Sequence, residues 1–299
     1  MIVEACEVTV SLLVFGRTGQ VATELRRLAG ADLHVTALDR SAADLADPEA
    51  CAAAIAATDA DVVINAAAWT AVDLAEAEED AARVVNAEAP GAVARACADR
   101  GIPFLHVSTD YVFDGAGARP WREDDPVAPI NAYGRTKLEG EARVAAAGGP
   151  HAILRTSWVF SAHGANFAKT MLKHGAVRDR LSVVDDQRGG PTAAADIAAV
   201  LVAMARAFHA GRGVSGVFHF AGAPTVSWRD FAVEIFRQAH WMRRPEVAAI
   251  RTEDWPTPAA RPRNSALDCG KIAAAYGIAQ PDWRASLGHV LAELKETAG

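Results

Sequence analysis

The sequence predicts an α/β protein with a doubly wound parallel sheet and a smaller C-terminal lobe interleaved with it. Short apolar runs rich in strand-forming residues alternate with helix-like stretches over the first half of the chain. This alternation is typical of a parallel sheet that helices cover on both faces. The alternation loosens after about residue 160, where smaller elements indicate a second lobe.

The expected elements follow one another in a simple order. Each apolar run is short enough for a strand buried on both faces. Pro48 opens an Ala-rich helix, as proline commonly does in a first helical turn. The expected strands cover residues 9–15, 34–38, 61–65 and 102–107, and the expected helices cover about 20–29, a stretch from 48, and 76–100.

The chain contains no internal repeat and no low-complexity linker that would separate two domains. Gly189 to Thr192 marks a turn, and Arg251 to Asn264 is rich in Pro and Arg. We therefore expect residues 1–160 to form mainly the first lobe. Residues 161–299 are expected to form mainly the second lobe, interleaved with the first.

Composition and charge exclude several classes of protein. Hydrophobic residues make up 51% of the chain and charged residues 22%, which supports a sizeable core and excludes a disordered or fibrous chain. The formal net charge is −7 without a long basic block, so we expect no nucleic-acid partner. The run from Val8 to Phe15 is too short to span a bilayer. Glu4 and Glu7 stand where a signal peptide would be positive, so we expect no membrane partner and a cytoplasmic location.

The cysteines and histidines predict no metal site. Cys6, Cys51, Cys97 and Cys269 are widely spaced and form no C-x-x-C motif. Such spacing predicts reduced, mostly buried thiols. The nine histidines form no H-x-x-x-H pair, and His106, which lies in an expected strand, is interpreted as a core residue.

The stretch Gly16-Arg17-Thr18-Gly19-Gln20-Val21 lies between the first expected strand and the first expected helix. Glycine permits a tight turn and lets backbone N–H groups approach a pyrophosphate at the helix N-terminus. Asp39 follows at the end of the second strand, where an acid accepts hydrogen bonds from an adenosine ribose. This spacing predicts a Rossmann-type NAD(P) site in the first lobe. A structural turn with a helix cap is the alternative.

The choice between NADH and NADPH is not settled by these residues. Asp39 favours NADH, whereas Arg17 and Arg40 could pair with the 2′-phosphate of NADPH. We therefore expect both cofactors to be accepted.

Tyr133 and Lys137 form a Y-x-x-x-K motif, which places both side chains on one face of a helix. A phenol with a pKa of about 10 is a poor proton donor near neutral pH, and a nearby ammonium is expected to lower that pKa. Thr109 lies at the carboxyl end of an expected strand, where ligands of parallel sheets bind. Its hydroxyl could donate to the same carbonyl oxygen as Tyr133. The three residues predict a site that reduces a carbonyl group. An exposed Tyr–Lys pair and a capping threonine are the alternative.

These motifs, in this order, resemble the extended short-chain dehydrogenases, and longer stretches resemble the dTDP-4-dehydrorhamnose reductase family within them. The resemblance spans roughly residues 9 to 295. Trp69 departs from it, because relatives often have His or Tyr there. The stretches that carry the resemblance are residues 16–20, 65–73, 108–113, 155–160, 166–171, 185–187 and 256–265.

The resemblance implies roles for individual residues. Gly19, Gln20 and Val21 would contact the cofactor pyrophosphate, Asp39 the adenosine ribose, and Asp44 and Leu45 the adenine. The implied cofactor-binding residues are Gly16, Arg17, Thr18, Gly19, Gln20, Val21, Asp39, Arg40, Asp44, Leu45, Ala66, Ala67, Ala68, Thr70, Val107, Tyr133 and Lys137. The implied substrate-binding residues are Val72, Asp73, Thr109, Asp110, Tyr133, Trp158 and Asn166, with Asn166 near the sugar's diphosphate.

The implied reaction is the NAD(P)H-dependent reduction of the 4-keto group of dTDP-4-dehydro-β-L-rhamnose to dTDP-L-rhamnose, the last step of dTDP-rhamnose biosynthesis. The resemblance also implies Mg²⁺ and a homodimer, since some relatives are described as Mg²⁺-dependent dimers. No carboxylate cluster in the sequence identifies such a metal site. Arg261 and Arg263 could bind a diphosphate or belong to a plain surface loop.

Three other functions compete with this one. A reductase of another dTDP-4-keto-deoxysugar would differ only in the pocket around Val72, Asp73 and Trp158. A non-catalytic, cofactor-binding regulatory subunit of the same fold would have no need of a proton donor such as Tyr133. An epimerase or dehydratase is disfavoured, because a dehydratase needs an acid–base pair and Thr109 is followed only by Asp110.

Overall fold

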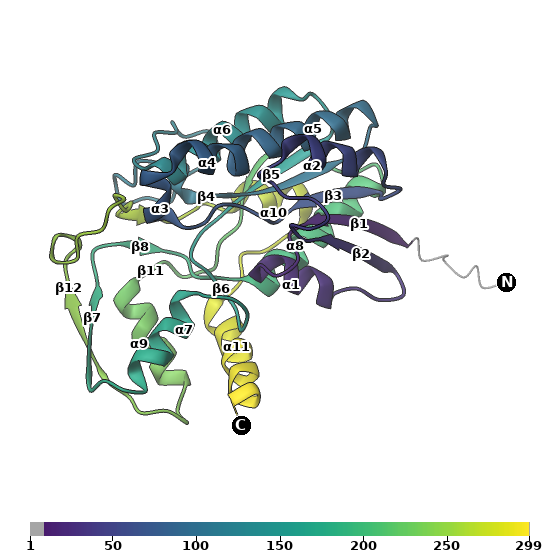
Figure 1. The fold of residues 1–299 in the computed structure, drawn as a ribbon. Helices are drawn as coiled ribbons and strands as arrows, with labels where there is room; N and C mark the ends of the chain where they lie inside the picture. Colours follow the sequence, from purple (N-terminus) through teal and green to yellow (C-terminus); the bar gives the residue numbers. More distant parts are fainter. Residues whose placement is uncertain (1–8, 299) are drawn as a thin grey trace.

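The computed structural model describes residues 9–298, and a six-stranded parallel sheet lies at its centre (Figure 1). The strand order is β2-β1-β3-β4-β5-β10, and every neighbouring pair is parallel. The order reverses between β1 and β3, which is where ligands bind in sheets of this type. The predicted doubly wound parallel sheet is confirmed. The strands are β1 (Val10–Phe15), β2 (Leu33–Leu38), β3 (Val62–Asn65), β4 (Phe104–Thr109), β5 (His151–Thr156) and β10 (Gly216–His219).

Each central strand is buried on both faces, which explains its continuous apolar sequence. Side chains alternate between the two faces of a strand. In β1, Leu12 and Val14 pack into one core cluster, whereas Leu13 and Phe15 pack into another on the opposite face. The apolar runs of the sequence therefore become a sheet with a core on either side.

Helices from both halves of the chain cover these two faces (Figure 1). One face packs against α1 (Gln20–Arg27), α8 (Ala194–His209) and α10 (Gly270–Tyr276). The other packs against α2 (Pro48–Ala56), α5 (Ala89–Asp99) and α6 (Ala132–Ala146).

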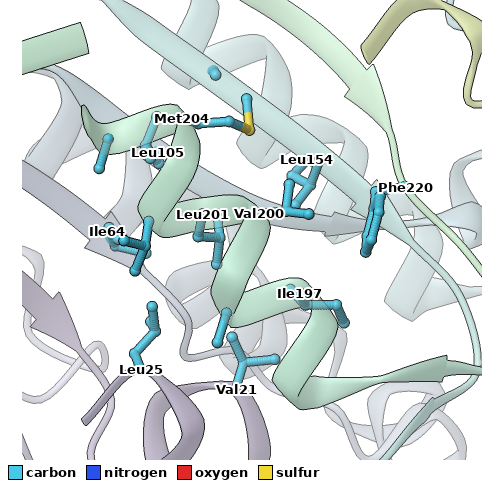
Figure 2. Packing of buried hydrophobic residues seen from close by; sticks show 14 of the residues in the cluster. Val21, Leu25, Ile64, Leu105, Leu154, Ile197, Val200, Leu201, Met204 and Phe220 are labelled. Carbon is cyan, nitrogen blue, oxygen red and sulfur yellow. The ribbon is translucent and has the colours of Figure 1, made fainter. Parts of the chain in front are cut away.

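Figure 2 shows how α8 fills the first of these cores. Its residues Ile197, Leu201 and Met204 are completely buried. They belong to the same cluster as Leu25 of α1 and Ile64 of β3. A helix from the second half of the chain therefore completes the core of the sheet, while the lobe boundary near residue 160 stays a prediction.

The segment around residues 76–100 is helical, as predicted, but it is divided into several helices. The structure has α3 (Val72–Ala77), α4 (Glu79–Arg83), a π-helical turn η1 (Val84–Glu88) and then α5. Glu78 leaves the helical conformation, with φ −128° and ψ 42°. Pro90 cannot donate a hydrogen bond to the Asn86 carbonyl, and its ring crowds that carbonyl. The helix widens into a π turn just before this proline.

The remaining elements form a second core below the sheet (Figure 1). There α7 (Phe167–Gly175), α9 (Trp228–Gln238) and α11 (Trp283–Ala298) pack around Phe231 and other apolar side chains. The short strands are β6 (Val159–Phe160), β7 (Arg180–Val184), β8 (Arg188–Gly189), β9 (Thr192–Ala193), β11 (Val226–Ser227), β12 (Glu246–Ile250) and β13 (Asn264–Ser265), and the 3₁₀ turns are η2 (Asp110–Val112) and η3 (Thr252–Asp254).

Cys51, Cys97 and Cys269 are buried free thiols, as predicted. Cys6, Glu4 and Glu7 lie outside the described residues. In residues 9–298, no helix is both long and apolar enough to cross a membrane.

Candidate active site

The glycine turn joins β1 to α1 at the carboxyl edge of the sheet. Gly16 has φ +103°, and a Cβ placed there would lie 3.2 Å from the Cβ of Ala67, so a side chain would be strained and crowded. Gly19 caps α1 without any side-chain hydrogen bond to the helix. The first N–H groups of α1 are therefore free of a side-chain cap, as a pyrophosphate site requires.

Asp39 lies where β2 ends, beside the glycine turn. It accepts hydrogen bonds from the Ser41 hydroxyl at 2.6 Å and from the Ser41 N–H at 3.0 Å. These bonds, led by the one from the hydroxyl, lower the pKa of the Asp39 carboxyl. The Arg17 guanidinium lies 3.4 Å from the same carboxylate, and Arg40 is exposed next to it. An acid and two arginines thus share the predicted adenosine end.

Two other segments predicted to contact the cofactor follow the strands next to β1. One follows β3 and the other follows β2. Ala66, Ala67, Ala68 and Thr70 follow β3, and the Ala66 N–H donates to the Phe15 carbonyl at the end of β1. Leu45 is buried in the core of the α2 face, and the Asp44 carboxylate accepts from the Ala46 N–H at 3.0 Å. Contact of Asp44 and Leu45 with adenine stays a prediction.

Thr109 and Tyr133 come together because α6 packs very closely on the chain that follows β4. A Cβ on Gly134 would lie 2.2 Å from the Tyr111 carbonyl oxygen, so only glycine permits this approach. Asn131 begins α6, and its side chain accepts from the Gly134 N–H at 2.8 Å. The Thr109 hydroxyl donates to the Asp110 carboxylate at 3.1 Å.

The pKa of Tyr133 moves in the direction opposite to the one expected from the sequence. Burial raises it to about 12, a contact with the Thr109 hydroxyl lowers it, and Asp110 raises it. Lys137 is not among the causes. Its Nζ instead donates to the Val107 carbonyl at 2.7 Å and lies 3.1 Å from Nε2 of His106. In this geometry Tyr133 is a protonated phenol at neutral pH.

Lys137 is only 1% exposed, and burial lowers its pKa to about 8, although Glu141 raises it. The Glu141 carboxylate is itself bound by Arg155, at 2.6 Å from Nη2, and by the Ser108 hydroxyl at 2.5 Å. This buried ion pair joins α6 to β4 and β5 behind the lysine.

Asp110 is buried, and burial raises its pKa to about 7. The Ser265 side chain and the Thr109 hydroxyl lower this pKa. Oδ1 of Asp110 accepts from Thr109, while its Oδ2 has no hydrogen bond of good geometry within residues 9–298. A buried carboxyl oxygen of this kind is costly unless a ligand completes its hydrogen bonds.

The predicted substrate residues Val72 and Asp73 lie at the start of α3. The Asp73 carboxylate accepts from the Arg261 guanidinium at 2.8 Å and from the Ala259 N–H at 3.1 Å. Arg261 is thus tied to Asp73, a pairing that sequence reasoning missed because the two residues are far apart in the chain.

Trp158 follows β5 with φ +49°, which is unusual for a residue other than glycine. Its ring stacks on Trp228 of α9 at 3.5 Å between centroids. A Cβ on Gly189 would lie 2.6 Å from the Trp158 ring. Such strain is commonly held at functional sites.

Asn166 begins α7, and its side chain is occupied by protein groups. Its Oδ1 accepts from the Lys169 N–H, and its Nδ2 donates to Gln20 of α1 at 3.0 Å and to the Ser161 carbonyl. Its predicted position near the sugar's diphosphate stays a prediction, as does the pyrophosphate contact of Gln20.

Sequence reasoning also missed Asn86 of the π turn. Asn86 accepts from the Trp69 N–H at 2.8 Å, and it donates to the Trp69 carbonyl at 3.2 Å and to the Thr136 hydroxyl at 3.1 Å. It thereby ties the loop after β3 to the helix of Tyr133. The one available signal was Pro90, which interrupts the helical pattern four residues later.

No group of three His, Cys, Asp or Glu side chains in the described part of the chain is placed to hold a metal ion. The Mg²⁺ that the resemblance implied stays a prediction, since this ion is often held by one or two carboxylates with waters and substrate phosphates.

The fold and the site define a Rossmann-type dinucleotide-binding protein with the Thr, Tyr and Lys of the short-chain dehydrogenases. The model of the RmlD substrate binding domain matches residues 10–296, and the chain belongs to this family.

Several similar proteins are named dTDP-4-dehydrorhamnose reductase. The chain is 42% identical over 279 residues to dTDP-4-dehydrorhamnose reductase of Sinorhizobium fredii, covering 92% of this chain and 94% of that protein. It is 43% identical over 296 residues to the protein of the same name from Burkholderia thailandensis, covering 95% and 98%. A crystal structure of dTDP-4-dehydrorhamnose reductase from Bacillus anthracis in complex with NADP is 31% identical, with a TM-score of 0.89 over 96% of this chain and all of that one. The resemblance seen in the sequence is confirmed.

Proposed function

We propose that this chain reduces the 4-keto group of dTDP-4-dehydro-β-L-rhamnose to dTDP-L-rhamnose with NADPH or NADH, as the last step of dTDP-rhamnose biosynthesis. The observation that carries the proposal is the meeting of Thr109 and the protonated phenol of Tyr133 at the carboxyl edge of the sheet. The names of the relatives support the substrate, and the NADP-bound relative supports the cofactor.

The chain's own residues would bind the cofactor at its two ends. The glycine turn from Gly16 to Val21 offers backbone N–H groups to the pyrophosphate. Asp39, Arg17 and Arg40 lie at the adenosine end, so we propose that both nicotinamides are accepted. A preference above about a hundredfold for either one would contradict this. When bound, the cofactor supplies the hydride.

Tyr133 is the proton donor in this proposal. Its raised pKa keeps the proton on the phenol at neutral pH, and negative charge building on the substrate oxygen makes that oxygen a strong acceptor. The Thr109 hydroxyl, turned from Asp110 to the same oxygen, would be a second donor that stabilises this charge. Lys137 would hold the nicotinamide ribose.

The sugar would lie between α3 and the chain after β5. The unpaired Oδ2 of Asp110 is suited to accept from a sugar hydroxyl. Val72, Asp73, Trp158 and Asn166 complete the proposed contacts.

The reductase of another dTDP-4-keto-deoxysugar remains the second candidate, because Trp158 and Trp228 stack in the pocket that would distinguish the sugars. A non-catalytic, cofactor-binding regulatory subunit is disfavoured, because Thr109, Tyr133 and Lys137 are all present. We also propose a cytoplasmic location, no nucleic-acid or membrane partner, and a homodimer.

The test is a turnover assay with enzymatically generated dTDP-4-dehydro-L-rhamnose. Cofactor oxidation is followed by absorbance, and the product is identified by NMR. We expect dTDP-L-rhamnose as the product. Cofactor binding without turnover on this sugar, but with turnover on another 4-keto sugar, would select the second candidate.

A further inference from the structure

A chain of buried polar groups crosses the sheet behind Tyr133. The Ala67 N–H donates to Oδ1 of Asn65 at 3.1 Å, and Nδ2 of Asn65 lies 3.2 Å from Nδ1 of His106. Nε2 of His106 lies 3.1 Å from Nζ of Lys137, which donates to the Val107 carbonyl at 2.7 Å. Asn65, His106 and Lys137 are all at most 2% exposed, so water does not supply alternative partners here.

The donors and acceptors in this hydrogen-bond network fix the tautomer and charge of His106. A backbone N–H can only donate, so the Asn65 oxygen must face Ala67 and the amide nitrogen must face His106. Nδ1 of His106 therefore accepts. Burial and, secondarily, Lys137 lower the pKa of His106 well below its ordinary value, so the ring is neutral and carries its one proton on Nε2.

This proton points at Lys137. An ammonium has three donors and no lone pair, so it cannot accept from Nε2–H. A neutral amine can accept from Nε2–H and still donate to the Val107 carbonyl. The arrangement therefore matches the amine form of Lys137, whose lowered pKa is consistent with it.

Few charged groups near Lys137 oppose its neutral amine form. Glu141, on the same helix, favours the ammonium, but its carboxylate is already bound by Arg155 of β5 and Ser108 of β4. Tyr133 is a neutral phenol near pH 8. Asp110 acts on Tyr133 and is not among the causes of the Lys137 shift.

We propose that His106, held by Asn65 with its proton on Nε2, is a positioning residue that stabilises the neutral amine of Lys137 on the Val107 carbonyl. When Lys137 turns from His106 to the cofactor ribose, the amine takes up one proton from the solvent and becomes an ammonium. This inference rests on the proposed function, because it requires the cofactor to bind beside Lys137. Cofactor binding is then coupled to proton uptake.

The variant Asn65→Asp tests the direction of the hydrogen bonds that His106 makes. A carboxylate at this position accepts both from the Ala67 N–H and from Nδ1–H of His106, so the ring proton moves to Nδ1. Nε2 then offers a lone pair to the ammonium, and the pKa of Lys137 rises. The control is His151→Gln, which alters a histidine at the amino end of β5 that hydrogen bonds to the Gly149 carbonyl, at the opposite edge of the sheet from Lys137.

The experiment is calorimetric titration of NADPH into the full chain at about pH 9 in two buffers of different ionisation enthalpy, which counts the protons taken up. Near this pH, Lys137 with a pKa of about 8 is mostly neutral. We expect uptake of about 0.9 proton for the wild type and for His151→Gln, and less than about 0.3 for Asn65→Asp. In ¹⁵N-histidine NMR, Nδ1 of His106 should have a pyridine-like shift, assigned by comparison with His106→Gln.

The possible results distinguish a failure of this inference from a failure of the proposed function. A pyrrole-like Nδ1 of His106 in the wild type overturns the inference even if Asn65→Asp does not fold, and so does unchanged proton uptake in a folded Asn65→Asp. NADPH binding without proton uptake in the wild type also overturns it while leaving the proposed function intact. Absence of NADPH binding overturns the proposed function and the inference with it.

Discussion

At the scale of single residues, burial moves three ionisable groups of the site toward their neutral forms. It raises the pKa of Tyr133 to about 12 and that of Asp110 to about 7, and it lowers that of Lys137 to about 8. Burial disfavours the charged form of either sign. At pH 7 the Tyr133 phenol is therefore neutral and keeps its proton for the substrate oxygen, whereas Asp110 is about half ionised and Lys137 loses its charge only above about pH 8.

Tyr133→Phe should lower kcat by about a hundredfold or more, because it removes the proton donor while keeping the ring. The Kd for NADPH should change less than about threefold. Tyr276→Phe is the matched control. The Tyr276 hydroxyl hydrogen bonds only to the backbone of Val214, and neither residue belongs to the proposed site. Near-normal turnover in Tyr133→Phe would remove Tyr133 as the donor.

Asp110→Asn should change the pH dependence of stability. The Asp110 carboxyl has a pKa of about 7 in the folded chain and about 4 when unfolded. Between these values the folded protein binds more protons, so the wild type loses stability as pH rises. Asparagine does not titrate. The free energy of unfolding of the variant, relative to wild type, should therefore increase by about 2.5 kcal/mol from about pH 5 to about pH 8.

Denaturant unfolding of both proteins at the two pH values measures this difference. A difference that stays constant with pH would show that the pKa of Asp110 is not raised.

The sequence predicted which residues meet at the site better than it predicted their protonation. The spacing of Tyr133 and Lys137 follows from helix geometry alone. The hydrogen-bond partner of Lys137 does not follow from helix geometry. His106 lies on a different element and reaches the lysine only through the packing of α6 on β4.

At the scale of elements, α6 is positioned by glycines that let it approach other backbones. A Cβ on Gly140 would lie 2.1 Å from the Asn86 carbonyl oxygen in the π turn. This contact and the hydrogen bond from Asn86 to Thr136 fix the helix that carries both Tyr133 and Lys137.

Gly140→Ala should therefore lower the free energy of unfolding by about 2 to 4 kcal/mol and reduce turnover, because the added methyl group pushes α6 away from the π turn. The control is Gly288→Ala in α11, where the nearest atom is the end of the Gln238 side chain at 3.3 Å. That change should be neutral or stabilise by up to about 1 kcal/mol. Thermal unfolding and kcat measured on both variants test this, and equal stability of the two would refute the role of Gly140.

Strands were the most predictable elements and the 76–100 segment was the least. The apolar runs at residues 9–15 and 61–65 match β1 and β3 closely, because a strand buried on both faces leaves a continuous apolar signature. In 76–100 Pro90 is the one sequence signal of a break, and the tertiary contacts of Asn86 that accompany the π turn leave no local pattern.

At the scale of the whole molecule, side-chain contacts tie the sheet to the later part of the chain around the site. Gln20 of α1 accepts from Asn166 and Ser161. Asp73 of α3 accepts from Arg261. The loop that contains Arg261 is held a second time, because Asn131 donates to the Ala260 carbonyl.

The order of the later elements could not be predicted from the sequence. α8 and β10 complete the central sheet and its core, whereas α7, α9 and α11 form a separate core. Short apolar runs after residue 160 fit either location, because local periodicity does not encode which distant strand they join.

If this chain transfers hydride to the C4 carbonyl of a dTDP-linked sugar, a deuterium label on the cofactor must appear at C4 of the product. The chain is incubated with dTDP-4-dehydro-L-rhamnose and NADPH that carries deuterium at both C4 positions of the nicotinamide, and the product is analysed by NMR. We expect dTDP-L-rhamnose with deuterium at C4 of the sugar. Protein that binds NADPH but leaves the sugar unreduced, or a product without deuterium at C4, would refute this hydride transfer.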